Sequence, residues 1–194
     1  MRIILASKSP RRREILELLG VKFDIETADT DETCDIKEPG TLVETLAKRK
    51  GMAVVEKVLK KEGCDKDVLF ISCDTLVYAD GEFLGKPKDV DDARRMISML
   101  SGNTHEVYSG ICLYLNGKCV TAHQSTKVEF ASMTPSEIET YISTDEPYDK
   151  AGGYAVQGKA ALYIKGIIGD YFNVVGLPVQ LLYSLLRDEF EITV

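Results

Sequence analysis

The sequence predicts a mixed α/β (α+β) protein, with an elongated mixed β-sheet flanked by helices and two lobes around a cleft. Apolar strand-like and helix-like segments alternate roughly along the first half of the chain. Residues 68–72, "VLFIS", form a continuous apolar run, which is typical of a strand buried on both faces. Two long strand-like segments flank Asn116-Gly117, the strongest short hairpin signal, and therefore indicate antiparallel pairing within the sheet.

The first half of the chain predicts three strands and two helices. The first helix carries apolar Ile15, Leu16, Leu18 and Leu19 and ends at Gly20, which suits a left-handed residue after a helix. An acidic loop, "DTDETCDIKEPG" at residues 29–40, precedes the second helix, which ends near residue 63. In chain order the expected elements are a strand at 3–6, a helix at 11–19, a strand at 23–28, a helix at about 41–61 and a strand at 68–72.

The second half begins with a hairpin turn at Asp80-Gly81. Asp89 can cap a helix whose apolar residues recur at spacings of three and four, and "TPSE" at residues 134–137 is typical of a capping box with proline at the first helical position. Strands are expected at 105–115, 118–131 and 161–167, and helices at 134–144 and 178–190. No internal repeat or linker divides the chain, so we expect a single domain over residues 1–194.

Composition limits the classes of function. The chain of 194 residues is 44% hydrophobic, carries a net charge of −7 and has a pI near 5.0, which argues against a general nucleic-acid binder. No apolar run approaches the length of a membrane span, and the first residues do not resemble a signal peptide, so we expect a cytoplasmic location. An odd number of cysteines without C-x-x-C spacing argues against a disulfide framework or zinc site and favours buried, reduced thiols.

The segment "LASKSPRRREIL" places three arginines at the start of the first helix. Each cation at that end interacts unfavourably with the helix dipole and destabilises the helix by about 0.3–1 kcal/mol. Serine hydroxyls and free backbone N–H groups at the same turn suit a bound anion, and guanidinium groups bind phosphate oxygens in pairs. A polyphosphate would supply the missing countercharge. The alternative is a solvated basic turn with Arg13 paired to Glu17; composition supports both about equally, and the hydroxyls favour binding.

Three further segments carry candidate residues. Asp74 follows the buried strand and could bind a divalent cation or take a proton from water, or else simply cap a turn. "GEFLGKPKD" is no P-loop, because Pro87 stands where the magnesium-binding hydroxyl belongs, although Lys86 could still reach a phosphate. Residues 48–50 are interpreted by default as a solvated basic face. "DKAGGYAVQG" has glycines that permit close approach to a ligand, or that only form a loop.

Taken together these segments resemble the Maf family, described as septum-formation inhibitor proteins, whose members are nucleotide pyrophosphatases. The resemblance covers "LASKSPRRREILELLG", "LAKRKGMAV", "CDTLVYADGEFLGKP", "LSGNTHEVYSG", "DEPYDKAGGYAVQG" and "VVGLP". It implies a fold similar to the inosine-triphosphate pyrophosphatases, with a nucleotide cleft between two lobes. It also implies hydrolysis of a nucleoside triphosphate between the α and β phosphates, with Asp74 as catalytic carboxylate and Mg²⁺ or Mn²⁺ as cofactor. We interpret Glu32, in the acidic loop, as a second carboxylate for the metal. The phosphate-binding residues would be Ser7, Arg12, Lys50 and Lys86.

The resemblance extends to a subfamily. Members that act on dTTP and UTP are similar to this chain at Arg11, Thr75 and Gln157, whereas a branch acting on 7-methyl-GTP resembles "SPWRR", "DQ" and "SEG" at these places. The Gln157 amide offers a donor and an acceptor, which match the mixed edge of uracil or thymine. A glutamate there would only accept, which suits the adjacent N–H donors of guanine. We therefore expect a dTTP/UTP pyrophosphatase with a house-cleaning role and a link to cell-division arrest.

Two alternatives remain. One is a nucleotide-binding regulator of septum formation without turnover, and the other is a 7-methyl-GTP-type or general house-cleaning pyrophosphatase. RNA binding is disfavoured by the net charge and by the lack of aromatic residues among the arginines. We expect a nucleoside triphosphate substrate, no nucleic acid and no membrane partner. The choice among pyrimidine nucleotides, the preferred metal and the formation of a homodimer stay open.

Overall fold

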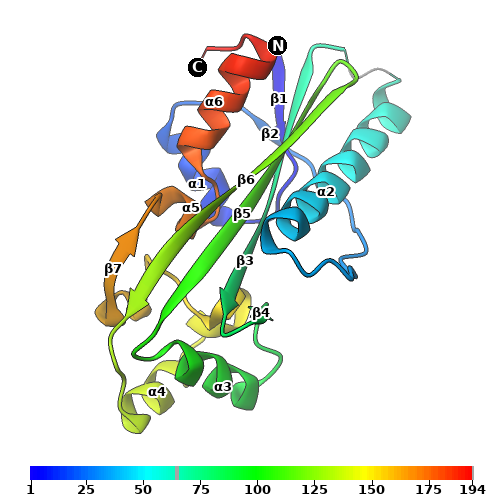
Figure 1. Cartoon of the computed structure of the whole chain (residues 1–194). Helices are drawn as coiled ribbons and strands as arrows, with labels where there is room; N and C mark the ends of the chain where they lie inside the picture. The colour runs from blue at the N-terminus through cyan, green and yellow to red at the C-terminus, as the bar shows by residue number, and fades with distance from the viewer. Residues whose placement is uncertain (64–65, 194) are drawn as a thin grey trace. The chain divides into compact units, whose positions relative to one another are not determined.

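A computed structural model describes residues 1–63 and 66–193 and contains one mixed sheet flanked by helices (Figure 1). The strand order is β2-β1-β3-β5-β6-β7, and β4 pairs with β3. Strands β2 and β3 each pair in parallel with β1, while β4 and β7 pair antiparallel with β3 and β6. The predicted mixed sheet is therefore confirmed. The strands are β1 (Arg2–Leu5), β2 (Asp24–Ile25), β3 (Val68–Ala79), β4 (Glu82–Leu84), β5 (Thr104–Leu115), β6 (Lys118–Phe130) and β7 (Ile164–Ile168).

The described helices include six α-helices and three short 3₁₀ helices. The α-helices are α1 (Pro10–Leu18), α2 (Pro39–Glu62), α3 (Val90–Leu100), α4 (Pro135–Ile142), α5 (Tyr171–Val175) and α6 (Val179–Phe190). The 3₁₀ helices are η1 (Glu146–Asp149), η2 (Ala151–Gly153) and η3 (Lys159–Tyr163). Contacts divide the chain into two compact units, which are described separately below. Unit 1 comprises Met1–Asp74, Ser109–Gln124 and Gly176–Val194, and unit 2 comprises Thr75–Tyr108 and Ser125–Val175.

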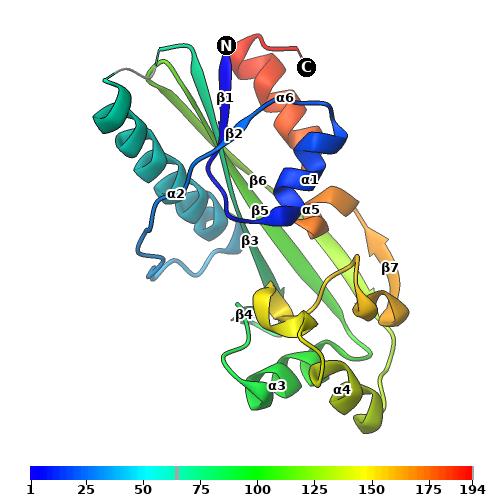
Figure 2. The ribbon, with the colours of Figure 1, turned by 180° about the vertical axis from the view of Figure 1, so that it is seen from behind.

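In unit 1, side chains alternate between the two faces of the parallel strands. Ile4 and Phe70 pack against Val54 and its neighbours on α2. Ile3 and Leu69 point to the other face, where α1 and α6 cover the strands around an apolar cavity of about 290 Å³. Figures 1 and 2 show α2 on one side of β1 and the pair α1 and α6 on the other. This alternation also decides which residues further along β3 face α2.

The contact between α2 and β5 depends on a glycine. A Cβ atom on Gly110 would lie 2.4 Å from the carbonyl carbon and oxygen of Val43, and 2.6 Å from the backbone nitrogen of Glu44. Since these are backbone atoms, they cannot move aside as a flexible side chain would. The helix itself begins two residues earlier than expected, because Pro39 suits its first position and the Glu38 carboxylate caps it by accepting from the N–H groups of Gly40 and Thr41.

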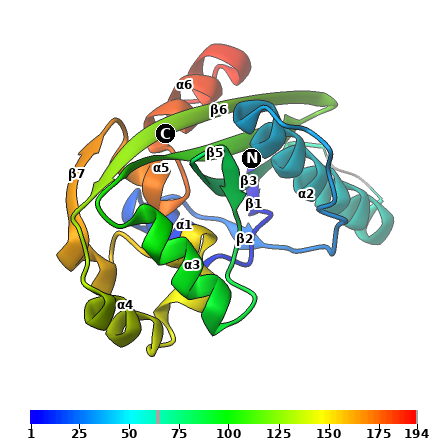
Figure 3. The same cartoon turned by 60° about the horizontal axis from the view of Figure 1, so that its bottom comes forward.

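In unit 2, the core lies between α3, α4 and the adjoining parts of β3, β5 and β6. Figure 3 shows α3 and α4 side by side at this end of unit 2. The core contains Val77, Ile97 and Phe130, all nearly without solvent exposure. His105 is buried there, its Nε2 lies 2.6 Å from the Tyr154 hydroxyl, and burial lowers its pKa to about 4. His105 is therefore neutral and acts as a packed aromatic group.

The local signals in the sequence are confirmed at both caps and both turns. Asp89 caps α3 by accepting from Asp92 N–H, and Thr134 and Glu137 form the capping box of α4. The turns Asp80-Gly81 and Asn116-Gly117 have positive φ at both positions, as this tight hairpin turn requires.

Three strand predictions were wrong at their bounds. The strand expected at 68–72 runs on to Ala79, where it pairs with β4, so Asp74 lies within β3 and not after it. The strand expected at 23–28 pairs with β1 only over Asp24–Ile25, and beyond it the Lys57 ammonium binds the Glu26 carboxylate and the Thr27 carbonyl. The strand expected from residue 161 begins at Ile164, because residues 159–163 form η3. Helix α5 was not predicted, since five residues carry too short a periodic pattern.

The described cysteines are free thiols. Cys73 and Cys112 are buried, whereas Cys34 and Cys119 are half-buried, and Cys64 lies outside the described residues. The sulfur atoms of Cys112 and Cys119 are 3.6 Å apart, and burial, with the neighbouring thiol, raises the pKa of Cys112 to about 12. None of the helices in the described ranges is both long and apolar enough to cross a bilayer.

Candidate active site

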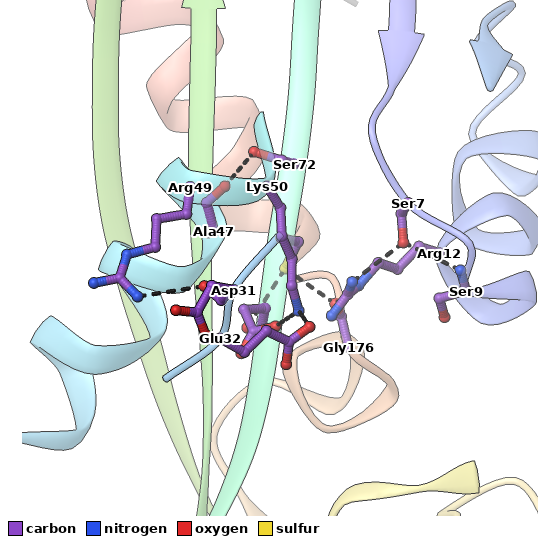
Figure 4. Close-up of polar contacts among 12 residues, drawn as sticks. Ser7, Ser9, Arg12, Asp31, Glu32, Ala47, Arg49, Lys50, Ser72 and Gly176 are labelled. Atoms are coloured by element: carbon purple, nitrogen blue, oxygen red, sulfur yellow. Dashed lines mark hydrogen bonds and ion pairs between the residues drawn. The ribbon is translucent and has the colours of Figure 1, made fainter. Parts of the chain in front are cut away.

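The predicted carboxylate Asp74 is held by a lysine from α2. Along β3, Ser72 and Asp74 face α2, and the Ser72 hydroxyl donates to the Ala47 carbonyl oxygen at 2.8 Å. Gly51 leaves the room for this contact, since a Cβ there would lie 2.4 Å from Ser72 Oγ. Docked in this way, α2 brings the Lys50 ammonium into an ion pair with Asp74. The same ammonium lies 3.0 Å from Glu32 Oε1, and Figure 4 shows Lys50 and Glu32 pointing toward one another.

Burial and charge together define this group of three residues. Asp74 is only 6% exposed, so its carboxylate needs a partner that replaces water. Burial by itself disfavours the charged form of Lys50, but the neighbouring Asp74 and Glu32 carboxylates outweigh it, and the pKa of Lys50 is raised. Lys50 is therefore a permanent cation beside a buried carboxylate.

Glu32 lies in the acidic loop, and the Arg49 side chain binds the backbone of that loop. The Arg49 guanidinium donates to the Thr33 carbonyl oxygen at 2.7 Å and to the Asp31 carbonyl oxygen at 3.4 Å, so it binds the backbone on both sides of Glu32. Our interpretation of residues 48–50 as a solvated basic face is wrong for Lys50, which is half-buried, whereas Lys48 and Arg49 are exposed. A sequence signal did exist, because an acidic loop precedes a basic helix and their charges are complementary.

A second group of polar residues lies where β1 leads into α1. Arg12 donates from Nη1 to Ser7 Oγ at 3.2 Å and from Nε to the Gly176 carbonyl oxygen at 2.8 Å. The Ser7 hydroxyl also accepts from the N–H of Ser9 at 3.2 Å (Figure 4). The turn thus places a guanidinium, a hydroxyl and a helix N-terminus together, as the sequence predicted for an anion site.

The group around Asp74 and the group around Arg12 are connected through one shared hydrogen-bond acceptor on the backbone. The Gly176 carbonyl oxygen that accepts from Arg12 also accepts from the Cys73 thiol at 3.2 Å, and Cys73 directly precedes Asp74. The pairing of Leu5 with Ile71 explains this meeting, because the parallel parts of β1 and β3 end at the same edge of the sheet. Ser7, Arg12, Lys50, Glu32 and Asp74 therefore gather in unit 1.

The remaining predicted residues lie in other elements. Arg11 is half-buried in the first turn of α1. Thr75 directly follows Asp74 on β3, Lys86 is exposed after β4, and Gln157 is exposed in the loop before η3. Arg13 pairs with Glu17 at 2.8 Å, so the solvated-turn interpretation is confirmed for that residue alone. The cleft expected between the lobes, and the binding roles of these residues, stay predictions.

The donors present fit a hard divalent cation. Asp74 and Glu32 both supply carboxylate oxygens against the same ammonium, and Mg²⁺ characteristically takes one or two carboxylates together with waters and substrate phosphates. No group of three or more histidine, cysteine or acidic residues with metal-binding geometry occurs over residues 1–63 and 66–193. The cation would therefore rely on substrate oxygens for much of its coordination.

A mixed α/β sheet that carries cationic side chains, a helix N-terminus and a buried carboxylate at one edge is typical of proteins that act on phosphorylated small molecules. The chain matches the family model "Maf-like protein" over residues 2–189, and it belongs to this family. It is 42% identical to a dTTP/UTP pyrophosphatase of Bacillus cereus, over all of this chain and 97% of that protein. It is 46% identical to a dTTP/UTP pyrophosphatase of Alkaliphilus metalliredigens, over 98% of this chain and 97% of that protein.

A solved structure also aligns with the chain, at low similarity. The nucleoside-triphosphatase, or dITP/XTP pyrophosphatase, of Mycobacterium abscessus aligns over 98% of this chain and 94% of its own, with a TM-score of 0.42 and 14% identity. Membership in the family rests on the family model and the sequence relatives instead.

Proposed function

We propose that this protein is a nucleoside triphosphate pyrophosphatase that hydrolyses dTTP and UTP to the nucleoside monophosphate and pyrophosphate. The observation that carries the proposal is the buried Asp74 carboxylate, paired with Lys50 and joined through Gly176 to the Ser7 and Arg12 anion site. The names of the relatives from Bacillus cereus and Alkaliphilus metalliredigens support the same activity.

In the proposed mechanism, Ser7, Arg12, Lys50 and Lys86 hold the triphosphate. Asp74 takes a proton from the water that attacks the α-phosphorus, and the bond from that phosphorus to the oxygen bridging the β-phosphorus breaks. The bridging oxygen leaves with pyrophosphate, and the cationic groups offset the charge that develops on it. Lys50 supplies the countercharge of Asp74 before substrate binds.

A divalent cation, Mg²⁺ or Mn²⁺, belongs to the same proposal. Asp74 and Glu32 would hold it, and when bound it would neutralise phosphate charge and lower the pKa of a bound water. Arg49, which binds the backbone on both sides of Glu32, would keep the second carboxylate in place.

Selection of the base is assigned to Arg11, Thr75 and Gln157. The exposed Gln157 amide can donate and accept at once, as uracil and thymine require. The proposal includes a house-cleaning role, which is the removal of surplus or modified pyrimidine nucleotides in the cytoplasm, and a separate link to cell-division arrest. A homodimer stays a prediction that sedimentation of the purified protein would test.

The deciding experiment is a panel of nucleoside triphosphates incubated with purified protein and Mg²⁺, with pyrophosphate and phosphate resolved as products. We expect pyrophosphate and monophosphate from dTTP and UTP, and a loss of at least about 100-fold in kcat for Asp74→Asn, which keeps the shape but removes the base. Tight dTTP binding without product would support the regulator instead. A substrate ranking led by 7-methyl-GTP would support the other pyrophosphatase branch.

A further inference from the structure

The loop that presents Gln157 is held by an acidic residue eleven positions earlier in the chain. The Glu146 carboxylate accepts from the N–H of Lys159 at 2.7 Å and from the N–H of Ala160 at 3.2 Å. These N–H groups open η3, which directly follows Gln157 and Gly158. Glu146 therefore caps the backbone immediately after the proposed base-selecting residue.

Gly158 extends this contact to the residue next to Gln157. A Cβ atom on Gly158 would lie 2.4 Å from the carboxyl carbon and from Oε1 of Glu146. The φ of Gly158 is −122°, which any residue can adopt, so a side chain at this position is opposed by the Glu146 carboxylate, which would have to move, and not by backbone conformation. The carboxylate and the loop backbone are thus in direct van der Waals contact.

The same carboxylate connects to the other end of the loop. The Tyr141 hydroxyl lies 3.1 Å from Glu146 Oε1 and 3.1 Å from the Gly153 carbonyl oxygen. Tyr154 follows, 5% exposed, with its hydroxyl against His105. Between this buried anchor and the Glu146 cap, the Gln157 side chain is exposed. An exposed amide on a backbone held at both ends is the arrangement that a specificity residue needs.

We propose that Glu146 is a positioning residue for base selection: it fixes the backbone at Gly158 and so presents the Gln157 amide in one orientation. This inference rests on the proposed function. An amide distinguishes uracil from cytosine only if its donor and its acceptor each meet the matching group, and a displacement of about 1 Å removes that match. Loss of the Glu146 cap should therefore reduce discrimination between bases more than it slows hydrolysis.

The test compares kcat/KM for dTTP and for dCTP, whose pairing edge has its donor and acceptor exchanged. In Glu146→Gln, one carboxylate oxygen becomes an amide group that faces a backbone N–H, so one cap bond is lost. We expect the preference for dTTP over dCTP to fall at least tenfold, mainly through a higher KM for dTTP, while kcat changes less than threefold. Glu139→Gln is the control, because Glu139 is an exposed acid that pairs with Arg94. It should leave the preference unchanged.

A second pair of variants tests the contact without removing the carboxylate. Gly158→Ala should reduce the preference by a similar factor, because its Cβ displaces either Glu146 or the loop. Adding Glu146→Asp to Gly158→Ala shortens the acid and makes room, so the double variant should regain part of the preference. Thermal melting confirms that each variant is folded. An unchanged preference in folded Glu146→Gln and Gly158→Ala, or no recovery in the double variant, overturns the inference.

The variant Gln157→Ala distinguishes a failure of this inference from a failure of the proposed function. If Gln157→Ala abolishes the preference and Glu146→Gln does not affect it, base selection stands and the role of Glu146 fails. If Gln157→Ala leaves the preference intact, both fail. If both variants lose it, the combination Glu146→Gln with Gln157→Ala should be no worse than Gln157→Ala alone, since the two residues would act through one amide.

Discussion

The buried polar residues of the described chain serve two different purposes. Ser72 and Asp74 point from β3 toward α2, and their contacts with Ala47 and Lys50 build the candidate site. His105 lies in the core of unit 2, where it packs against Phe130 and Tyr154 and touches no candidate site residue in the contacts described. The sequence could single out Asp74, which comes shortly after the apolar run at residues 68–72, although the structure places it inside β3. Nothing local in the sequence distinguishes a candidate site residue from a buried histidine of the core.

At this scale we predict that His105 makes the protein sensitive to mild acid. Burial lowers the pKa of His105 from an ordinary value of 6.5 to about 4, and its Nδ1 has no hydrogen-bond partner within the described residues. Below pH 6.5 the His105 side chain binds a proton in the unfolded chain but stays neutral in the folded chain. The contribution of neutral His105 to stability is therefore fully present above pH 6.5 and is lost as the pH falls toward 4, by about 3 kcal/mol.

The measurement is the free energy of unfolding in urea at several pH values between 7 and 4, for the wild type and for His105→Gln. Glutamine keeps a polar group that can reach Tyr154 but does not titrate in this range. The variant should be less stable at pH 7, because it loses ring packing, yet its stability should depend less on pH. Parallel curves for the two proteins would contradict the prediction.

Among the elements, the long helix α2 shows how packing is decided by one residue on a neighbouring strand. Gly110→Ala places a Cβ against the backbone of Val43 and Glu44. We expect a loss of about 1–3 kcal/mol in the free energy of unfolding, from overpacking that rotamer changes cannot relieve. Gly166→Ala on β7 is the matched control, since no atom lies within 4 Å of its added Cβ. A stable Gly110→Ala variant would show that α2 can shift without cost.

The capping box of α4 gives a second prediction for an element. Thr134 accepts from the Glu137 N–H, and the Glu137 carboxylate accepts from the Thr134 N–H at 2.7 Å. Thr134→Ala removes one half of this exchange and should lower the free energy of unfolding by about 1 kcal/mol. Ser136→Ala, at an exposed position of the same helix, should change it much less. Equal melting temperatures for Thr134→Ala and the wild type would show that the cap is dispensable.

For the whole molecule, the relevant contrast is between an acidic chain and a local cationic site. The net charge of −7 disfavours loose binding of polyanions to the general surface, so a bound triphosphate needs the Arg12 and Lys50 region. A ligand that binds only the folded chain stabilises it by mass action, by about 2.7 kcal/mol at 100 times its Kd.

We therefore predict that dTTP raises the melting temperature of Asp74→Asn protein, in which turnover is blocked, by about 5–10 °C at that concentration. dATP at the same concentration should raise it less, because the base would not match Gln157. Thymidine, which lacks phosphates, should have little effect. An equal shift with dATP and dTTP would contradict base selection, and no shift with either would contradict the binding site itself.

The sequence by itself determined the local structure and the family. Apolar runs, caps and tight turns depend on residues within a few positions of each other, so the caps at Asp89 and Thr134 and the turn at Asn116-Gly117 could be predicted. Ordered motifs along the chain identified the family and the candidate residues, including Asp74. The bounds of β2 and β7 could not be predicted from local pattern, because the backbone next to each strand binds a distant side chain, Lys57 at Thr27 and Glu146 at Lys159.

The tertiary structure decided which residues meet. Lys50 lies 24 positions from Asp74, and Arg12 lies 164 positions from Gly176. These contacts follow from the parallel register of β1 with β3 and from the alternation that turns Asp74 toward α2. The spacing of residues along the chain does not encode strand order, so only the folded backbone could bring a lysine, a carboxylate and an arginine to the same edge of the sheet.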